Sequence, residues 1–231
     1  MRYAVLADIH GNEYALKAVL DDVKEAGIDK LLLLGDYVGY YYGADVILDL
    51  IRQWDFKAIK GNHETLLFRA INDPSYLKEI TGKYGSGHEV ALKKLKESDL
   101  ELLRSFPHQL EFSVNDLSIL LCHGSPWDND KYVYPDADED TLQKYDDQDH
   151  DYIFYGHTHY ACELRRGHKK IINPGSVGQS RQKGGIAFWG VFDANRNEFE
   201  FCQTPYETKP LREIVKDLDP SIPYNYEILC R

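Results

Sequence analysis

The chain has 231 residues, of which 43% are hydrophobic and 28% charged, and its formal net charge is −11. This length suits one large domain with a substantial core and is short for two. The acidic balance argues against broad binding to duplex nucleic acid. No stretch approaches the roughly 20 apolar residues that span a bilayer, so we expect no membrane partner.

The first part of the chain alternates strands and helices. Residues 2–7 predict a buried strand, and 13–26 predict a helix because the apolar residues repeat at i, i+3, i+4 and i+7. Two further strands, 31–34 and 56–60, flank a helix over 44–54. Strand, helix, strand, helix, strand implies parallel pairing through right-handed crossovers.

The rest of the chain divides into a helical stretch and a set of strands. Residues 64–107 predict a helical insertion, in which Ser98 to Glu101 has the form of a capping box that opens a short helix. The strands expected after Glu111 are 118–122, 152–155, 170–172, 186–192 and 198–202. Turn residues at 193–197 predict an antiparallel hairpin, and a last helix is expected near Pro210.

Residues 127–150 differ from their surroundings, because they are rich in Asp and Tyr and show little periodicity. This loop insertion is either a solvated surface segment or a lid beside a site. We expect residues 1–231 to form a single domain that carries both insertions. The four widely spaced cysteines include no CxxC pair, and the N-terminus has no signal-peptide pattern, so we expect reduced thiols and a cytoplasmic location.

Six short islands of acidic, amide and histidine residues mark the chain, and nearly all follow apolar runs. They are residues 8–12, 35–36, 61–64, 123–124, 156–159 and 173–176. Parallel strands that end in such residues bring them to one edge of a sheet, which is where α/β proteins build their sites. Asp, His and Asn without Cys suit a pair of divalent metals. The sequence therefore predicts a binuclear metal hydrolase.

These islands resemble the signature of the calcineurin-like metallophosphoesterase superfamily, which reads D-x-H, G-D, G-N-H-[DE], H and G-H-x-H. The resemblance runs from Asp8 to Ser176. The compact length and the runs at 35–40 and 173–178 resemble the small bacterial and archaeal phosphodiesterase branch. The resemblance implies an α/β fold, a four-layer αββα sandwich of two mixed sheets, with a binuclear metal site at the C-terminal ends of the strands.

The resemblance also implies a role for each residue of the site. Asp8, His10 and His159 would hold the first metal, and Asn62, His123 and His157 the second. Asp36 would bridge both metals. Mn²⁺ is expected first, and Fe or Zn²⁺ also suit these ligands. A metal-bridging hydroxide would attack phosphorus while Asn62 stabilises the developing charge. His63 would protonate the leaving alkoxide or stabilise the transition-state charge as an imidazolium, or it would serve only as a supporting hydrogen-bond donor.

Substrate-binding residues are less clearly marked. Asn12 either binds a phosphate oxygen or caps the following helix. Phosphoprotein phosphatases carry G-D-x-x-D-R-G, whereas Gly39 and Tyr40 stand where the second Asp and the Arg would be. This argues against a protein Ser/Thr phosphatase and against symmetrically cleaving diadenosine tetraphosphate hydrolases. Arg181 and Lys183 either replace the missing charge or lie on the surface.

Tyrosines suggest what the substrate is. Tyr40, Tyr41 and Tyr42 either stack on a nucleobase or pack as an aromatic cluster, and Tyr132 and Tyr134 would form a second wall. The leading hypothesis is a phosphoesterase that cleaves phosphodiester, or also phosphomonoester, bonds of a small nucleotide-type substrate. The alternatives are asymmetric hydrolysis of dinucleoside polyphosphates and a non-catalytic scaffold. A scaffold is disfavoured because all seven ligand positions and His63 are filled.

Overall fold

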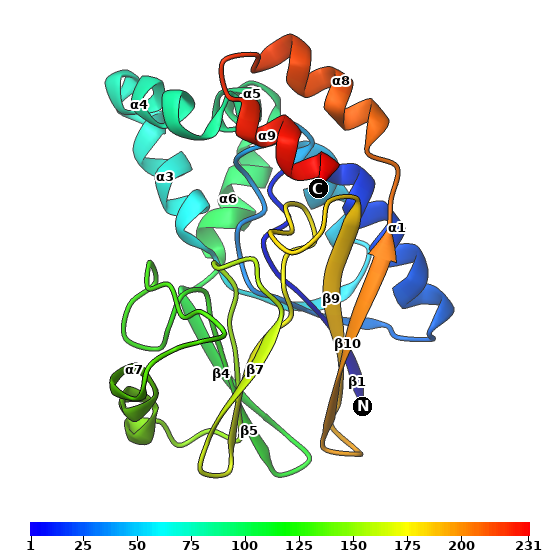
Figure 1. Ribbon diagram of the computed structural model, residues 1–231, viewed down its shortest axis with the longest axis vertical. Helices are drawn as coiled ribbons and strands as arrows, with labels where there is room; N and C mark the ends of the chain where they lie inside the picture. Colours follow the sequence, from blue (N-terminus) through cyan, green and yellow to red (C-terminus); the bar gives the residue numbers. More distant parts are fainter.

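Two mixed five-stranded sheets form the centre of the structure, a computed structural model that describes residues 1–231 (Figure 1). The first sheet has the order β10-β9-β1-β2-β3 and the second β4-β5-β6-β8-β7. The first contains β1 (Arg2–Leu6), β2 (Lys30–Leu33), β3 (Asp55–Ala58), β9 (Ile186–Asp193) and β10 (Glu198–Pro205). The second contains β4 (Gln109–Val114), β5 (Leu117–Cys122), β6 (Tyr152–Phe154), β7 (Cys162–Arg166) and β8 (Lys169–Asn173).

The predicted crossovers are confirmed in the first sheet. Strands β1, β2 and β3 pair in parallel, and α1 (Glu13–Glu25) and α2 (Ala44–Ile51) connect them. The predicted hairpin is also confirmed, because β9 and β10 pair antiparallel around the turn at 194–197. In the second sheet β5, β6 and β8 are parallel, and β4 and β7 are antiparallel edges. Strand β7 was not predicted, since its partly exposed, charged residues lack a clear apolar alternation.

The alternation of side chains along β1 shows the layers. Tyr3 and Val5 point into the core between the two sheets, where they join Leu121 and Phe154 of the second sheet. Ala4 and Leu6, on the opposite face of the strand, belong instead to the core beneath α1 and α2. A strand with both faces buried in this way must be nearly all apolar, as the sequence of β1 is. The predicted two-sheet α/β sandwich is therefore confirmed.

The outer face of the second sheet is covered by residues of the 127–150 insertion. This segment includes α7 (Glu139–Gln143) and the 3₁₀ helix η1 (Lys144–Asp147), which lie beside β4 and β5 in Figure 1. Tyr145 and Val133 are buried against Leu120 and Ile153 of the sheet. The insertion is thus partly a structural layer, which neither sequence-based interpretation anticipated.

Most of the remaining helices gather at one end of the molecule, above the sheets (Figure 1). They are α3 (Asn62–Ile71), α4 (Pro74–Tyr84), α5 (Gly87–Lys94), α6 (Glu97–Ser105), α8 (Lys209–Leu218), α9 (Pro223–Glu227) and the 3₁₀ helix η2 (Ile228–Cys230). The capping box expected at Ser98 was misplaced by two residues, because the Asp99 carboxylate accepts the Lys96 N–H at 2.8 Å and caps the helix there. None of the helices combines the length and apolar composition needed to cross a bilayer.

Candidate metal centre

The seven predicted ligands all follow the C-terminal ends of strands. Asp8 and His10 come after β1, Asp36 after β2 and Asn62 after β3, and the three other histidines follow β5 and β6. All are buried except Asn62, which is partly exposed. The structure brings all seven together at the shared edge of the two sheets, as parallel strand ends should.

The residues expected around the first metal form one compact group. Ligand atoms of Asp8, His10 and His159 lie within 4.8 Å of one another. The Nε2 atoms of His10 and His159 are 3.0 Å apart, and Asp8 Oδ1 is 3.8 Å from His159 Nε2. The Asp8 carboxylate also accepts the backbone N–H of His157, at 3.0 and 3.1 Å for its two oxygens. This hydrogen bond joins the β1 and β6 loops, and with them the two sheets.

The residues expected around the second metal form an adjoining group. Asn62 Oδ1 lies 3.0 Å from His123 Nε2 and 3.0 Å from His157 Nδ1. Asp36 Oδ2 lies 3.2 Å from His123 Nε2 and 3.6 Å from His10 Nε2. Asp36 therefore stands between the two groups, at the place where a bridging carboxylate is needed.

Each of the four histidines donates one ring N–H to a backbone carbonyl, at 2.7 to 3.1 Å. The acceptor carbonyl is that of Val38 for His10, Leu34 for His123, Asp130 for His157 and Gln179 for His159. Because a carbonyl can only accept, the bonded nitrogen carries a proton, and the other nitrogen is the one that faces the centre.

This arrangement points acceptor atoms at acceptor atoms. The lone pairs of His10 and His159 face each other, and His123 Nε2 faces oxygens of Asp36 and Asn62. Such atoms repel one another unless a cation or proton lies among them. Nitrogen and oxygen donors without sulfur fit borderline-hard divalent ions, so the residues present suit the metals that the sequence predicted.

The ionisation of the histidines agrees with this interpretation. Burial lowers the pKa of both His10 and His157 to about 4, and it lowers that of His159 as well, so these rings are neutral as ligands must be. For His123 burial is the largest single effect and acts in the same direction, but the Asp36 and Asp8 carboxylates and the Leu34 carbonyl together raise the pKa to about 10. In the metal-free protein the proton on His123 thus supplies positive charge that a bound cation would replace.

The backbone is strained at the same place. Five of the nine non-glycine residues with positive φ are predicted ligands, with φ between 49° and 68°: Asp8, His10, Asp36, His157 and His159. This left-handed region is unfavourable for residues with a Cβ. Strain of this kind gathers where the surrounding structure imposes it, most often at functional sites. Nothing in the sequence indicated it.

His63 lies beside the ligands and is itself buried. Its ring centroid is 4.7 Å from that of His10, and its Nδ1 has no hydrogen-bond partner. A ring nitrogen of His63 also lies within 4.8 Å of ligand atoms of His10 and Asp36, so the distances allow it to bind metal as well. Burial lowers the pKa of His63 well below its usual value, which keeps the ring neutral at pH 7.

Sequence reasoning missed His88, a buried residue of α5. Its ring stacks on that of His63, with centroids 5.1 Å apart and planes 13° apart. Gly39 leaves the space for both rings, because a Cβ there would lie 2.1 Å from His63 Nδ1 and 2.9 Å from His88 Cε1. The glycine that replaces the phosphatase aspartate therefore has a steric reason. No pattern in the helical stretch could have singled out His88.

Sequence reasoning also gave no role to Glu64, although it belongs to the third island. Its buried carboxylate accepts four backbone N–H groups at 2.8 to 3.2 Å. The donors are Asp36, Tyr37, Val38 and Gly61. Glu64 therefore ties the loop that carries the bridging ligand to the turn before α3.

Two of the three predicted substrate-binding residues take structural positions. Asn12 is buried and caps α1, accepting the Ala15 N–H at 3.1 Å and donating to the Gly178 carbonyl at 2.8 Å. The capping alternative therefore describes Asn12. Tyr40 is also buried, and its ring stacks on His63 at 5.1 Å.

Stacking of a nucleobase on Tyr41 or Tyr42 is wrong. Both rings are buried in a cluster beneath the C-terminal helices. The Tyr41 hydroxyl donates to the Asn225 carbonyl at 3.1 Å, and the Tyr42 hydroxyl donates to Asp219 at 2.7 Å. The packing alternative is correct, because residues close to the C-terminus cover this cluster.

Arg181, the third predicted substrate-binding residue, is partly buried, whereas Lys183 is exposed. The Arg181 Nε atom is buried without a hydrogen-bond partner. The guanidinium acts to lower the pKa values of Tyr40 and Tyr132, although burial, the larger effect, raises both. It also acts on Asp8 in the metal centre. Of the two candidates for the missing positive charge, Arg181 is the one that faces the site.

Two sheets that deliver acidic, amide and histidine ligands to one edge define the class of metal-dependent phosphoesterases. Residues 1–196 match the model of the calcineurin-like phosphoesterase superfamily domain, so the chain belongs to this superfamily. Its members use divalent metal ions to hydrolyse phosphoester bonds, and the chain has the clusters to bind such ions.

Known relatives extend the comparison. An uncharacterized protein of Methanocaldococcus jannaschii is 31% identical over 94% of this chain and 93% of its own. A metallophosphoesterase from Sphaerobacter thermophilus has a TM-score of 0.80 at 24% identity, over 99% of this chain and 98% of its own. A novel archaeal phosphodiesterase has a TM-score of 0.55 at 15% identity, over 88% of this chain and 99% of that phosphodiesterase. The two structural likenesses concern the fold alone.

Proposed function

We propose that the protein is a binuclear metal-dependent phosphodiesterase that acts on a small phosphorylated molecule. The observation that carries the proposal is the set of seven buried or partly buried residues whose ring nitrogens and side-chain oxygens converge at the shared edge of the two sheets. Asp8, His10 and His159 would hold one ion and Asn62, His123 and His157 the other, with Asp36 shared: seven residues in all. Mn²⁺ is the first choice, with Fe or Zn²⁺ as alternatives.

When bound, two divalent ions supply Lewis-acid chemistry, which lowers the pKa of a shared water and polarises phosphoryl oxygens. The protein contributes orientation, because the carbonyl bonds fix each histidine tautomer. Asn62 presents its side chain at the partly exposed side of the centre, where its amide N–H₂ can donate to a phosphoryl oxygen.

His63 is proposed as the residue that acts on the leaving group. Its ring lies beside His10 but its Nδ1 has no partner within the chain. The anionic phosphate of a bound substrate would favour the imidazolium form of His63, which would pass its extra proton to the leaving oxygen as the ester bond breaks and return to the neutral form. General acid catalysis of this kind contributes about 10²–10⁴-fold. Stacking on Tyr40 and His88 holds the ring in place.

The test is hydrolysis of bis-p-nitrophenyl phosphate with Mn²⁺ and with EDTA. The rate should depend on Mn²⁺ and disappear in EDTA. His63→Ala should lower kcat by about 10²–10⁴-fold while metal analysis still finds two ions per chain. The matched control is His168→Ala, since His168 is exposed in the turn between β7 and β8. Loss of metal in His63→Ala would make His63 a ligand and overturn its assigned role.

The same assay separates the alternatives. A metal-loaded protein with no activity toward phosphodiesters or phosphomonoesters would be a scaffold. Asymmetric hydrolysis of diadenosine tetraphosphate would release ATP and AMP, and Arg181 is the residue on this chain that would hold the extra phosphates. We further propose that no duplex nucleic acid is bound, in line with the net charge of −11. A cytoplasmic location is proposed on the four free cysteines.

A further inference from the structure

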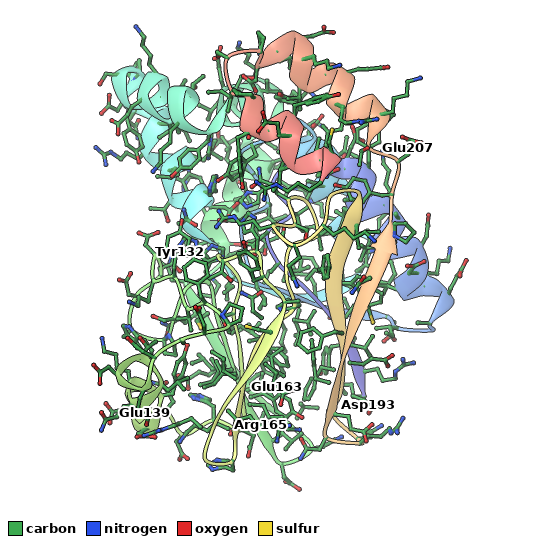
Figure 2. The ribbon with its side chains drawn as sticks, viewed as in Figure 1. Tyr132, Glu139, Glu163, Arg165, Asp193 and Glu207 are labelled. Carbon is green, nitrogen blue, oxygen red and sulfur yellow. The ribbon has the colours of Figure 1, made fainter.

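Two tyrosines of the 127–150 insertion stand exposed at the metal centre. Tyr132 and Tyr134 are 45% and 40% exposed, whereas Tyr40, Tyr41 and Tyr42 are buried. The exposed rings stack with centroids 5.8 Å apart and planes 14° apart. Figure 2 shows Tyr132 where the helical end of the molecule meets the loops of the second sheet.

This aromatic surface begins on a metal ligand. The Tyr132 ring centroid is only 4.0 Å from that of His157. The His157 ring is itself held by the Asp130 carbonyl, two residues before Tyr132 in the same loop. The insertion therefore fixes a ligand and an exposed aromatic ring with one short segment, and their relative position cannot vary freely.

Cationic groups face the same surface from two other elements. Arg181 comes two residues after Gln179, whose carbonyl holds the His159 ring, and its backbone N–H donates to the His159 carbonyl at 3.5 Å. Lys83 lies at the end of α4 with its Nζ 4.8 Å from the Tyr84 ring. Because the Tyr84 ring centroid is 4.8 Å from that of His63, both cations lie near the metal centre, and on a chain of net charge −11 they favour an anionic ligand there.

Folding alone gives no reason for this arrangement. Tyrosine rings contribute most to stability when they are buried, and this chain buries many of them. Two parallel rings left open beside a phosphoester centre instead present a flat face to a ligand. Stacking of a base on such a face is worth about 1–3 kcal/mol, and an aliphatic group gains no comparable stacking.

We propose that Tyr132 and Tyr134 form a stacking platform for a nucleobase, so that the substrates are nucleotide esters whose phosphate lies at the metal centre. The inference rests on the proposed function, because the metal centre is what would hold the phosphate. It moves the nucleobase site from the buried tyrosines at 40–42 to the insertion. It also gives the insertion a second role, in specificity, besides covering the sheet.

The test compares AMP with ribose 5-phosphate, which share ribose and phosphate and differ by the base. Isothermal titration calorimetry on the Mn²⁺-loaded protein measures both dissociation constants. AMP should bind about 5- to 150-fold more tightly, which is the range that stacking supplies. Tyr132→Leu should remove most of this preference, because leucine keeps an apolar side chain but no aromatic face. Tyr134→Leu, farther from the ligands, should reduce it.

Tyr14→Leu on α1 is the matched control and should leave the preference unchanged. Equal affinities for the two ligands in the wild type would overturn the platform, and so would a preference that survives in both platform variants. Because binding is measured rather than turnover, the result is independent of the phosphodiesterase assay. Tight AMP binding with no hydrolysis of bis-p-nitrophenyl phosphate would contradict the proposed function and leave the platform standing.

Discussion

The carboxylate of Glu64 offers a sharp test of how the loop of the bridging ligand is held. Oε2 accepts the N–H groups of Asp36 and Gly61, and Oε1 accepts those of Tyr37 and Val38. In Glu64→Gln the amide oxygen can keep one pair, but the NH₂ group must face the other pair of donors. Each buried N–H left unpaired costs about 1–3 kcal/mol, so the substitution should destabilise the fold by about 2–6 kcal/mol.

The measurement is urea unfolding of the metal-free protein in EDTA, with free energies of unfolding from linear extrapolation. Burial raises the pKa of Glu64 to about 7, so pH 8 keeps the carboxylate ionised. Glu101→Gln, at an exposed position of α6, is the matched control and should change stability by less than about 0.5 kcal/mol. If Glu64→Gln is as stable as wild type or more so, burial of the charge outweighs the four hydrogen bonds and the reasoning is refuted.

Three further predictions concern stability and reactivity. In Gly178→Ala the added Cβ would lie 1.8 Å from a backbone carbonyl oxygen, so this substitution should lower the melting temperature strongly. Gly27→Ala should lower it far less, because φ there is +66° but no atom lies within 4 Å of the added Cβ. Similar losses in the two variants would contradict the prediction. At pH 8 a thiol reagent should modify the exposed Cys230 in the native protein. It should modify Cys122 only after denaturation, because Cys122 is buried and burial raises the pKa of its thiol. Rapid modification of Cys122 in the native protein would disprove its burial. Burial lowers the pKa of His88 to about 4, so the stability that depends on the neutral ring should be complete above pH 6.5 and be lost as pH falls toward 4. The urea midpoints at pH 7.5 and pH 5 should therefore differ less in His88→Phe than in wild type. An equal difference in the two proteins would count against this role of His88.

The parts of the fold that could be predicted are those in which local pattern and burial agree. Strand β1 is apolar on both faces because helices cover one side and the second sheet the other, and its sequence shows this directly. Asp8 follows β1 and Asp36 follows β2, and both could be assigned to one edge of the sheet because parallel strands end at the same edge. The meeting of the candidate ligands at one edge could therefore be predicted before any coordinates.

The parts that could not be predicted depend on residues far away in the chain. Tyr41 and Tyr42 look like an exposed aromatic run, yet their hydroxyls bond to Asn225 and Asp219, more than 170 residues later. His88 occupies space that Gly39 leaves open, and neither residue indicates the other. Contacts of this kind depend on tertiary packing, which short-range periodicity does not encode.

The metal centre shows a second reason why sequence reasoning stops short. The groups that fix the four histidine tautomers are backbone carbonyls, and any residue type supplies a carbonyl. A motif can therefore identify a histidine as a ligand but cannot say which of its nitrogens faces the metal. Here His157 presents Nδ1 while His10 presents Nε2, because the carbonyls lie on opposite sides of the two rings. It follows that side chains at Val38 or Asp130 can change without moving a ligand, provided that the loop keeps its path. Substitutions that alter this path, such as those at the close-packed glycines, should disturb the metals more than changes of the side chains that flank them.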